Sequence, residues 1–285
     1  MKVFYHSDLD GRASAAVIAA FINNYDKDDY FEVAYIDSLP LDKISDGESV
    51  FFVDYSFKKD TVWVLQNLLE KNCDIIWIDH HTSSIELEKS MPELKEIKGI
   101  RSDEYSGAVL TQMYIHNWEY NDCDYFIKLV DDYDCWKYNL EPYTTFFKLG
   151  LDTYKYDALD KVWVDLLDED FDTWKSIMDK GGIIKGYVDE DNVQYRDSFA
   201  YESEICGNKC LVVNKRSNSW IFGDKYNDYP LVMVWVFNGE FYSYSIFSSN
   251  ADIDCSKIAE SYGGGGHKGA AGFKSTELLF KKVGM

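Results

Sequence analysis

Short apolar runs alternate with helical segments over the first 80 residues of the chain. Four of these runs have the length and composition of buried strands: residues 2–5, 32–36, 49–53 and 74–78. Two segments between them are predicted as helices: residues 12–23, which are rich in Ala, Ile and Val, and residues 58–71, where Val62, Leu65, Leu68 and Leu69 form one stripe. Apolar strands that alternate with helices predict a parallel sheet covered on both faces, in an α/β domain.

Beyond residue 100 the pattern predicts helices first and a small mixed domain afterwards. Helices are expected at residues 107–118, with Ser106 as a candidate N-cap, and at residues 122–130, and a helical, aromatic pattern covers residues 143–204. The last part contains a strand at 209–214, two strands at 231–237 and 241–247 around the hairpin signal Asn238-Gly239, and a helix at 255–262. We therefore expect two domains, residues 1–195 and residues 200–285, the second of α+β type.

Acidic and histidine side chains follow three of the predicted strands at the point where each strand ends. They are His6, Asp8 and Asp10 after the first strand, Asp54 after the third, and Asp79-His80-His81 after the fourth. Because ligands of parallel sheets bind at the carboxyl ends of the strands, we expect these side chains to meet at one edge. Buried carboxylates are unfavourable unless their charge is compensated, and divalent cations would compensate it.

The residue types of these clusters are those that hold divalent cations. In an extended segment His6, Asp8 and Asp10 would point to one side, and Gly11 lets the chain turn into the next helix. One imidazole with two carboxylates suits a cation such as Mn²⁺. Further donors are available from Asp54, Asp79 and His80, and from one of Asp131, Asp132 and Asp134. This set is sufficient for two ions about 3.5–4 Å apart, the arrangement that activates water in phosphoryl transfer.

Each cluster taken alone has a simpler interpretation. An Asp-x-Asp sequence is usually a solvated turn, and Asp54 at the end of a strand can cap the following helix. The occurrence of all three clusters at predicted strand ends favours the metal site.

A run of four glycines, Gly263–Gly266, precedes His267 and Lys268. If a helix restarts at residues 269–271, the glycine N–H groups would form an anion cradle at its N-terminus. His267 and Lys268 would then add charge-assisted hydrogen bonds to a phosphate. The alternative interpretation of the run is a flexible loop or hinge.

The composition restricts the partners and the compartment. A formal net charge of −21 argues against nonspecific binding of long duplex DNA. A small phosphorylated substrate held by metal ions remains compatible with this charge. No apolar run of about 18 residues or more predicts a membrane span. The six cysteines lack a zinc-binding spacing, which favours a reduced, cytoplasmic protein. Aromatic residues, 16% of the chain, can stack on nucleobases, although such residues more often belong to the core.

Together these sequences resemble a known family. His6-Ser7-Asp8-Leu9-Asp10-Gly11, Val53-Asp54, Asp79-His80-His81 and the segment 131–136 are similar to motifs I to IV of the DHH phosphoesterases. Gly264-Gly265-Gly266-His267 with Ala270-Ala271-Gly272 is similar to the signature of the DHHA1 domain. The resemblance implies a parallel-sheet DHH domain joined to a smaller DHHA1 domain, with the site in the cleft between them. It also implies hydrolysis of phosphoester or phosphoanhydride bonds with two Mn²⁺ ions, for which Mg²⁺ or Co²⁺ can substitute.

The resemblance also implies roles for individual residues. One ion would be held by His6, Asp8 and Asp54, and the second by Asp10, Asp54, His80 and Asp132. Asp132 is preferred over Asp131 because Trp136 follows it by four residues, as in motif IV of the family. Asp79 and His81 would join Asp54 in the catalytic group, with His81 beside the substrate phosphate. Substrate would be bound by Gly264, Gly265, Gly266, His267, Lys268 and Arg12. An arginine that many DHHA1 domains carry before the glycine run is missing from residues 245–249, and Arg12, Lys215, Arg216 or Lys268 would replace it.

Within the family, this short chain most resembles the NrnB-type oligoribonucleases. The implied activity is a Mn²⁺-dependent phosphodiesterase that releases mononucleotides from short RNA, in a protein that can form a homodimer. Alternatives within the family are hydrolysis of cyclic dinucleotides, of 3′-phosphoadenosine-5′-phosphate or, ranked last, of pyrophosphate. The alternative from another class is a non-catalytic, metal-bound scaffold that binds nucleotides.

Overall fold

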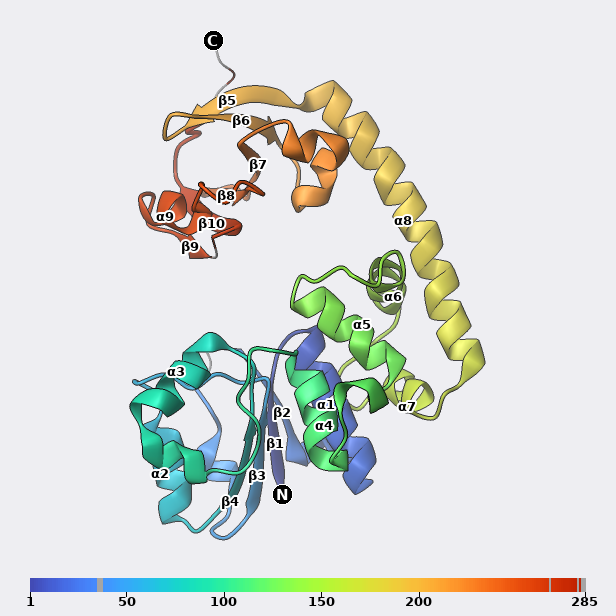
Figure 1. Cartoon of the computed structure of the whole chain (residues 1–285), viewed down its shortest axis with the longest axis vertical. Coiled ribbons are helices and arrows are strands. Elements are labelled where there is room, and N and C mark those ends of the chain that lie inside the picture. The colour runs from blue at the N-terminus through green and yellow to red at the C-terminus, as the bar shows by residue number, and fades with distance from the viewer. Residues whose placement is uncertain (35–37, 267, 281, 283–285) are drawn as a thin grey trace. The chain divides into compact units, whose positions relative to one another are not determined.

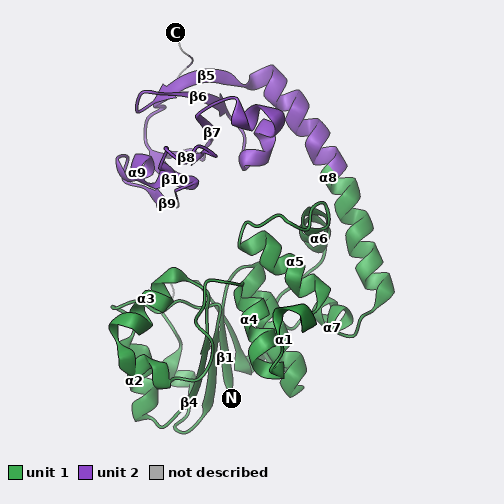
Figure 2. Ribbon diagram, viewed as in Figure 1, with its two compact units in different colours: residues 1–185 green, residues 186–285 purple. Residues whose placement is uncertain are grey.

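The computed structural model describes residues 1–34, 38–266, 268–280 and 282. The chain forms two compact units, Met1–Lys185 and Gly186–Met285, which divide inside the long helix α8 (Phe171–Phe199) (Figure 2). The expected domain ranges, 1–195 and 200–285, stay a prediction. Among the described residues, no helix is both long enough and apolar enough to cross a bilayer.

The first unit is built on a parallel sheet (Figure 1). Its strands are β1 (Lys2–His6), β2 (Tyr30–Val33), β3 (Ser49–Val53) and β4 (Asp74–Ile78), in the order β2-β1-β3-β4. Every pairing in this sheet is parallel, which confirms the expected fold class. The second strand lies earlier than expected, and part of its predicted range, residues 35–37, is outside the described residues.

Helices cover both faces of this sheet because successive strand residues point to opposite sides. Phe4, Phe52 and Trp77 pack on the face that contains α2 (Trp63–Glu70) and α3 (Thr82–Ser90). The neighbouring residues Val3 and Tyr5 pack on the opposite face, against α1 (Leu9–Ile22) and α4 (Gly107–His116). The two layers lie on either side of the strands in Figure 1.

A second layer of helices packs against α1 and α4. It contains α5 (Tyr125–Asp134), α6 (Tyr143–Leu151), α7 (Lys161–Leu167) and the start of α8. Helix α5 extends beyond the predicted range 122–130, so the acidic residues 131–134 belong to its last turn. Backbones of α6 and α8 approach closely, since a Cβ on Gly181 would lie 1.8 Å from the carbonyl oxygen of Phe146. Only glycine fits that contact.

The second unit contains the last part of α8, a mixed sheet and the short helix α9. Its elements are β5 (Tyr201–Ile205), β6 (Asn208–Val213), β7 (Leu231–Phe237), β8 (Tyr242–Phe247), α9 (Cys255–Glu260), β9 (Gly265–Gly266) and β10 (Ala270–Ser275). The strand order is β5-β6-β7-β8-β10-β9, with β6 and β7 parallel and the other pairs antiparallel. The β7–β8 hairpin confirms the Asn238-Gly239 prediction.

Two expectations in this region are wrong. The helical pattern assigned to residues 143–204 ends at Phe199, and β5 follows as a strand. The helix expected to restart at residues 269–271 is instead the strand β10. Short 3₁₀ helices complete the chain, at Lys27–Asp29, Leu41–Lys43, Pro92–Glu96, Tyr120–Asp122 and Ser219–Asn227.

Candidate metal centre

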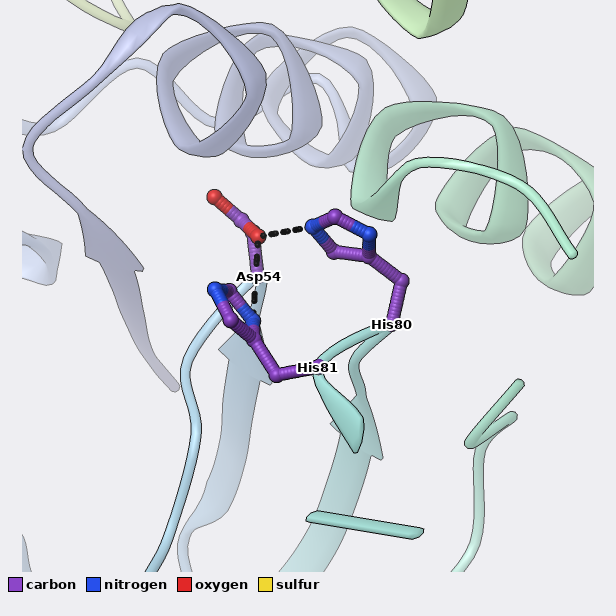
Figure 3. A group of neighbouring side chains, drawn as sticks. All are labelled: Asp54, His80 and His81. Atoms are coloured by element: carbon purple, nitrogen blue, oxygen red, sulfur yellow. Dashed lines mark ion pairs between the residues drawn. The ribbon is translucent and has the colours of Figure 1, made fainter. Parts of the chain in front are cut away.

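The carboxyl edge of the parallel sheet brings the predicted clusters together. β1 ends at His6, β3 is followed by Asp54, and β4 is followed by Asp79 and the two histidines. Figure 3 shows His80 and His81 on two sides of Asp54, each joined to it by an ion-pair contact. Residues far apart in the chain thus meet because three adjacent strands are parallel.

Asp54 is the least compensated residue of this cluster. Its side chain is 1% exposed, and its two carboxylate oxygens lack a hydrogen-bond donor among the described residues. Its backbone is left-handed, with φ of 52°, which is strained for an aspartate. The nearest imidazole nitrogens are His80 Nε2 at 3.3 Å, His81 Nδ1 at 3.8 Å and His6 Nδ1 at 3.9 Å. A buried and strained carboxylate without a hydrogen-bond donor is the feature that a bound cation would explain.

His6 and Asp8 form one side of the cluster. His6 Nδ1 lies 2.6 Å from Asp8 Oδ2, while Asp8 Oδ1 accepts a hydrogen bond from the Gly11 N–H at the start of α1. Burial alone would raise the pKa of Asp8, but these two hydrogen bonds lower it to about 2. Donor atoms of His6, Asp8 and Asp54 lie within 4.8 Å of one another, close enough for one cation.

His80, Asp10 and Asp134 form the other side. His80 Nε2 lies 3.4 Å from Asp134 Oδ2 and 3.7 Å from Asp10 Oδ2. Burial, followed by the charges of Asp10 and Asp8, raises the pKa of Asp134 to about 9. Burial also raises the pKa of Asp10, and it raises that of Asp54 with help from the neighbouring carboxylates. Without a cation, these carboxylates therefore share protons instead of all being ionised.

The N-terminus of α4 fixes the orientation of Asp10. Asp10 is fully buried, and its carboxylate accepts hydrogen bonds from the N–H groups of Gly107 at 2.6 Å and Ala108 at 2.9 Å. A Cβ on Gly107 would lie 2.7 Å from Asp54 Cβ and 2.9 Å from Asp10 Oδ2. The absence of a side chain at Gly107 therefore lets the helix approach both carboxylates.

Gly107→Ala is expected to weaken metal binding by about 10–100-fold, because the added methyl group displaces Asp10 and Asp54. Calorimetric titration of the metal-free protein with Mn²⁺ measures this effect. The matched control is Gly186→Ala, since a Cβ there meets nothing within 4 Å. Equal Mn²⁺ affinities in the two variants would show that the approach of α4 does not position the carboxylates.

Asp79 holds the imidazole of His81 through a hydrogen bond. Asp79 is fully buried, its Oδ1 lies 2.8 Å from His81 Nδ1, and its Oδ2 accepts a hydrogen bond from Ser84. Ser56 contacts Ser84 at 2.9 Å and extends the network. Burial lowers the pKa of His81, but the hydrogen bond and charge of Asp79 outweigh this and raise it overall. Asp79 therefore positions the His81 ring and favours its protonated form.

Asp132, the aspartate preferred from the sequence, is not part of this cluster. Its carboxylate accepts hydrogen bonds from the N–H groups of Asn139 at 2.8 Å and Leu140 at 3.1 Å, and from the Thr144 hydroxyl. These contacts hold the segment that follows α5. Asp134, the last residue of α5, is the aspartate that reaches His80. The structure thus favours Asp134 over Asp132 as the ligand from α5.

Asp132→Asn is expected to lower the stability of the fold, and Asp134→Asn is expected to lower the affinity for metal. Asp132→Asn removes an acceptor that satisfies buried donors, so it lowers the free energy of unfolding by about 1–3 kcal/mol. Asp134→Asn leaves these buried hydrogen bonds intact and weakens metal binding. Urea denaturation and Mn²⁺ titration of both variants separate the two roles. Loss of metal binding in a stable Asp132 variant would restore the original assignment.

The residues expected to bind substrate are Arg12 in the first unit and residues 264–268 in the second unit. Arg12 forms a two-point ion pair with Glu32, at 2.9 Å for each contact, and stacks on Tyr156. Gly265 and Gly266 form β9 and pair with β10, so the described residues of this run form no anion cradle at a helix N-terminus. A Cβ on Gly264 would lie 2.1 Å from the Gly272 carbonyl oxygen. The two backbones are therefore too close for any residue but glycine at position 264. Lys268 is exposed, and His267 lies outside the described residues.

Comparisons with known proteins bear on the fold. No protein-family model matches the chain. The uncharacterized protein R106 of Acanthamoeba polyphaga mimivirus is 31% identical over 272 residues, which cover 85% of this chain and 58% of the viral protein. This chain therefore spans less than two thirds of that relative.

Three solved structures share the architecture. The pGpG-specific phosphodiesterase PggH of Vibrio cholerae has a TM-score of 0.58 and 12% identity, over 96% of this chain and 93% of that one. The DHH domain of a member of the s1p family of ribosomal proteins has a TM-score of 0.55 and 12% identity. The match covers 95% of this chain and 81% of that one. An exopolyphosphatase-related protein of Bacteroides fragilis has a TM-score of 0.51 and 13% identity. The match covers 97% of this chain and 87% of that one. The chain has the fold of these DHH-type proteins.

Proposed function

We propose that this protein is a metal-dependent phosphoesterase that hydrolyses short oligoribonucleotides to mononucleotides. The observation that carries the proposal is Asp54, a buried carboxylate without a hydrogen-bond donor among the described residues, at the centre of two groups of metal-binding side chains. The fold shared with phosphoesterase structures supports the same class of reaction.

The residues present fit divalent cations. The group of His6, Asp8 and Asp54 offers one imidazole and two carboxylates, the donor set that suits Mn²⁺. His80 Nε2 contacts Asp54, Asp10 and Asp134, and so connects a second set of carboxylates to Asp54. A pair of bound cations would supply an activated water and stabilise the charge of the phosphoryl oxygens.

The chain's own residues orient the reaction. Asp79 holds His81 at Nδ1, with the ring beside Asp54, so that His81 in its protonated form can donate a hydrogen bond to a phosphate oxygen. The fixed carboxylates and the α4 amide groups keep this geometry before substrate arrives, which is the main source of rate in phosphoryl transfer. The expectation that His267 and the glycine run bind the far end of the substrate stays a prediction.

The length of the substrate follows from charge. A chain with 29 basic and 50 acidic residues repels an extended phosphate backbone, so bound cations would supply most of the attraction. A substrate with one or a few phosphodiester bonds avoids this repulsion.

A second candidate is hydrolysis of a guanine dinucleotide or another signalling nucleotide. The observation that favours it is the shared fold with the pGpG-specific phosphodiesterase of Vibrio cholerae. A single phosphodiester bond between two nucleosides suits the same cluster.

A substrate panel tests the proposal. Purified protein is assayed with Mn²⁺ on di- to pentaribonucleotides, pGpG, cyclic dinucleotides, 3′-phosphoadenosine-5′-phosphate and pyrophosphate, and in parallel with EDTA. We expect the fastest turnover on the short oligoribonucleotides and no turnover with EDTA. Equal rates with EDTA would contradict the metal-dependent reaction. Tight Mn²⁺ binding without turnover on any substrate would favour the scaffold alternative.

A further inference from the structure

One cysteine lies inside the candidate metal centre. Cys135 directly follows the last residue of α5, and its Sγ lies within 4.8 Å of donor atoms of His80 and Asp134. The other five cysteines, at positions 73, 123, 206, 210 and 255, belong to none of the metal-binding groups found among the described residues. Cys135 therefore differs from the other cysteines of the chain in its surroundings.

We propose that Cys135 ligates the cation held by His80 and Asp134, so that this position takes Co²⁺, Zn²⁺ or Fe²⁺ through a sulfur bond. The inference rests on the metal-dependent function proposed above. Thiolate ligands favour these softer ions, whereas carboxylates and imidazole alone also suit Mn²⁺. The group of His6, Asp8 and Asp54 has no sulfur, so the two positions would prefer different ions.

Independent support comes from Asp54. Its buried carboxylate has no donor among the described residues, and its Oδ1 lies 3.3 Å from His80 Nε2, the same imidazole that faces Cys135. Donor atoms of Cys135, His80 and Asp134 thus lie together, and Asp54 contacts the same His80 from a third segment. The C-terminus of α5, where Asp134 and Cys135 lie, also favours a positive charge through the helix dipole.

Cys135 stays a neutral thiol until a cation binds, because burial, followed by the charges of Asp131 and Asp134, raises the pKa of the thiol. Its Sγ lies 3.5 Å from Asp131 Oδ1, to which the thiol donates. Asp131 is itself balanced by Lys137 Nζ at 2.7 Å and by the Ser106 N–H at 2.7 Å. When a cation binds, the sulfur–metal bond replaces the S–H bond, and the proton leaves to solvent. Lys137 and Ser106 then keep Asp131 in place without the thiol.

Cobalt absorption spectroscopy tests the proposal directly. The full-length, metal-free protein is titrated with Co²⁺, and a sulfur-to-cobalt charge-transfer band is expected in the near ultraviolet together with visible d–d bands. Cys135→Ser is expected to keep the d–d bands, to lose the charge-transfer band and to bind Co²⁺ about tenfold or more weakly. Cys123→Ser, which removes a buried thiol of the same unit outside the metal groups, should retain both features.

Three outcomes have distinct meanings. Visible d–d bands without a charge-transfer band in the unmodified protein would overturn the cysteine ligand and leave the proposed function standing. No binding of either Co²⁺ or Mn²⁺ would overturn both. If Cys135→Ser fails to fold, alkylation of the unmodified protein decides: Co²⁺ should protect Cys135 but not the exposed Cys206, and equal alkylation of Cys135 with and without Co²⁺ would overturn the proposal.

Discussion

Asp54→Asn is expected to abolish hydrolysis, with a loss in kcat/KM of about 1,000-fold or more, or about 4 kcal/mol of transition-state stabilisation. Asp54 lies in contact distance of His6, His80 and His81, so it belongs to both groups of donors. Asparagine is the informative replacement because it tolerates the left-handed backbone at this position, whereas alanine would add strain. The loss in kcat/KM would therefore measure the effect of removing the negative charge, without added backbone strain.

The same substitution should make the metal-free protein more stable. It removes an ionisable group at a position where both oxygens are buried and lack donors among the described residues, so the penalty of burying a charge disappears. Steady-state turnover and urea denaturation at pH 8 measure the two effects. Asp74→Asn, at the exposed start of β4, is the control and should change neither. An Asp54 variant with more than a tenth of the original activity would contradict its central role.

The metal-free protein is expected to lose stability as the pH rises, and Mn²⁺ should remove this loss. The pKa of Asp134 is raised to about 9, so the folded state binds a proton that the unfolded chain releases near pH 4. Between these two values the free energy of unfolding falls with pH, by at most about 1.4 kcal/mol per pH unit for one group. The raised pKa of His81 acts in the same direction. The lowered pKa of Asp8 acts only below about pH 4.

Thermal unfolding at pH 5.5 and pH 8, with EDTA and with Mn²⁺, tests this expectation. With EDTA the melting temperature should be lower at pH 8, and the increase produced by Mn²⁺ should be larger there, because the cation replaces the protons. Asp134→Asn should flatten the pH dependence with EDTA and reduce the Mn²⁺ effect. An Mn²⁺ effect of the same size at both pH values would count against cations at these carboxylates.

The parallel sheet could be predicted because its strands are read directly from the sequence. Phe4, Phe52 and Trp77 lie in continuous apolar runs, as expected for strands covered on both faces. The sequence does not separate β5 from the preceding helix: Tyr201–Ile205 has the alternation of a strand, but no glycine or proline lies between it and α8. The sequence does not predict β10, because Ala270 and Ala271 favour a helix and the pairing of this segment with β8 and β9 is not visible locally.

The proximity of the candidate metal ligands at the strand ends could be predicted for the same reason. His6, Asp8, Asp54 and His80 depend only on where strands end, and the structure brings them together. The sequence alone does not decide among the three aspartates of α5, since the side chain that faces His80 depends on the residue at which the helix stops. Gly107 and Cys135 carry no local signal, and their proximity to the cluster arises from the packing of α4 against the sheet and of α5 against α1 and α4.

Anomalous diffraction from a crystal soaked in Mn²⁺ is the most direct test of the central claim. The account predicts manganese peaks in contact with Asp54, one beside His6 and Asp8 and one beside His80 and Asp134. Ordered carboxylates at these positions with no anomalous peak among them, in a crystal that binds manganese elsewhere, would contradict it.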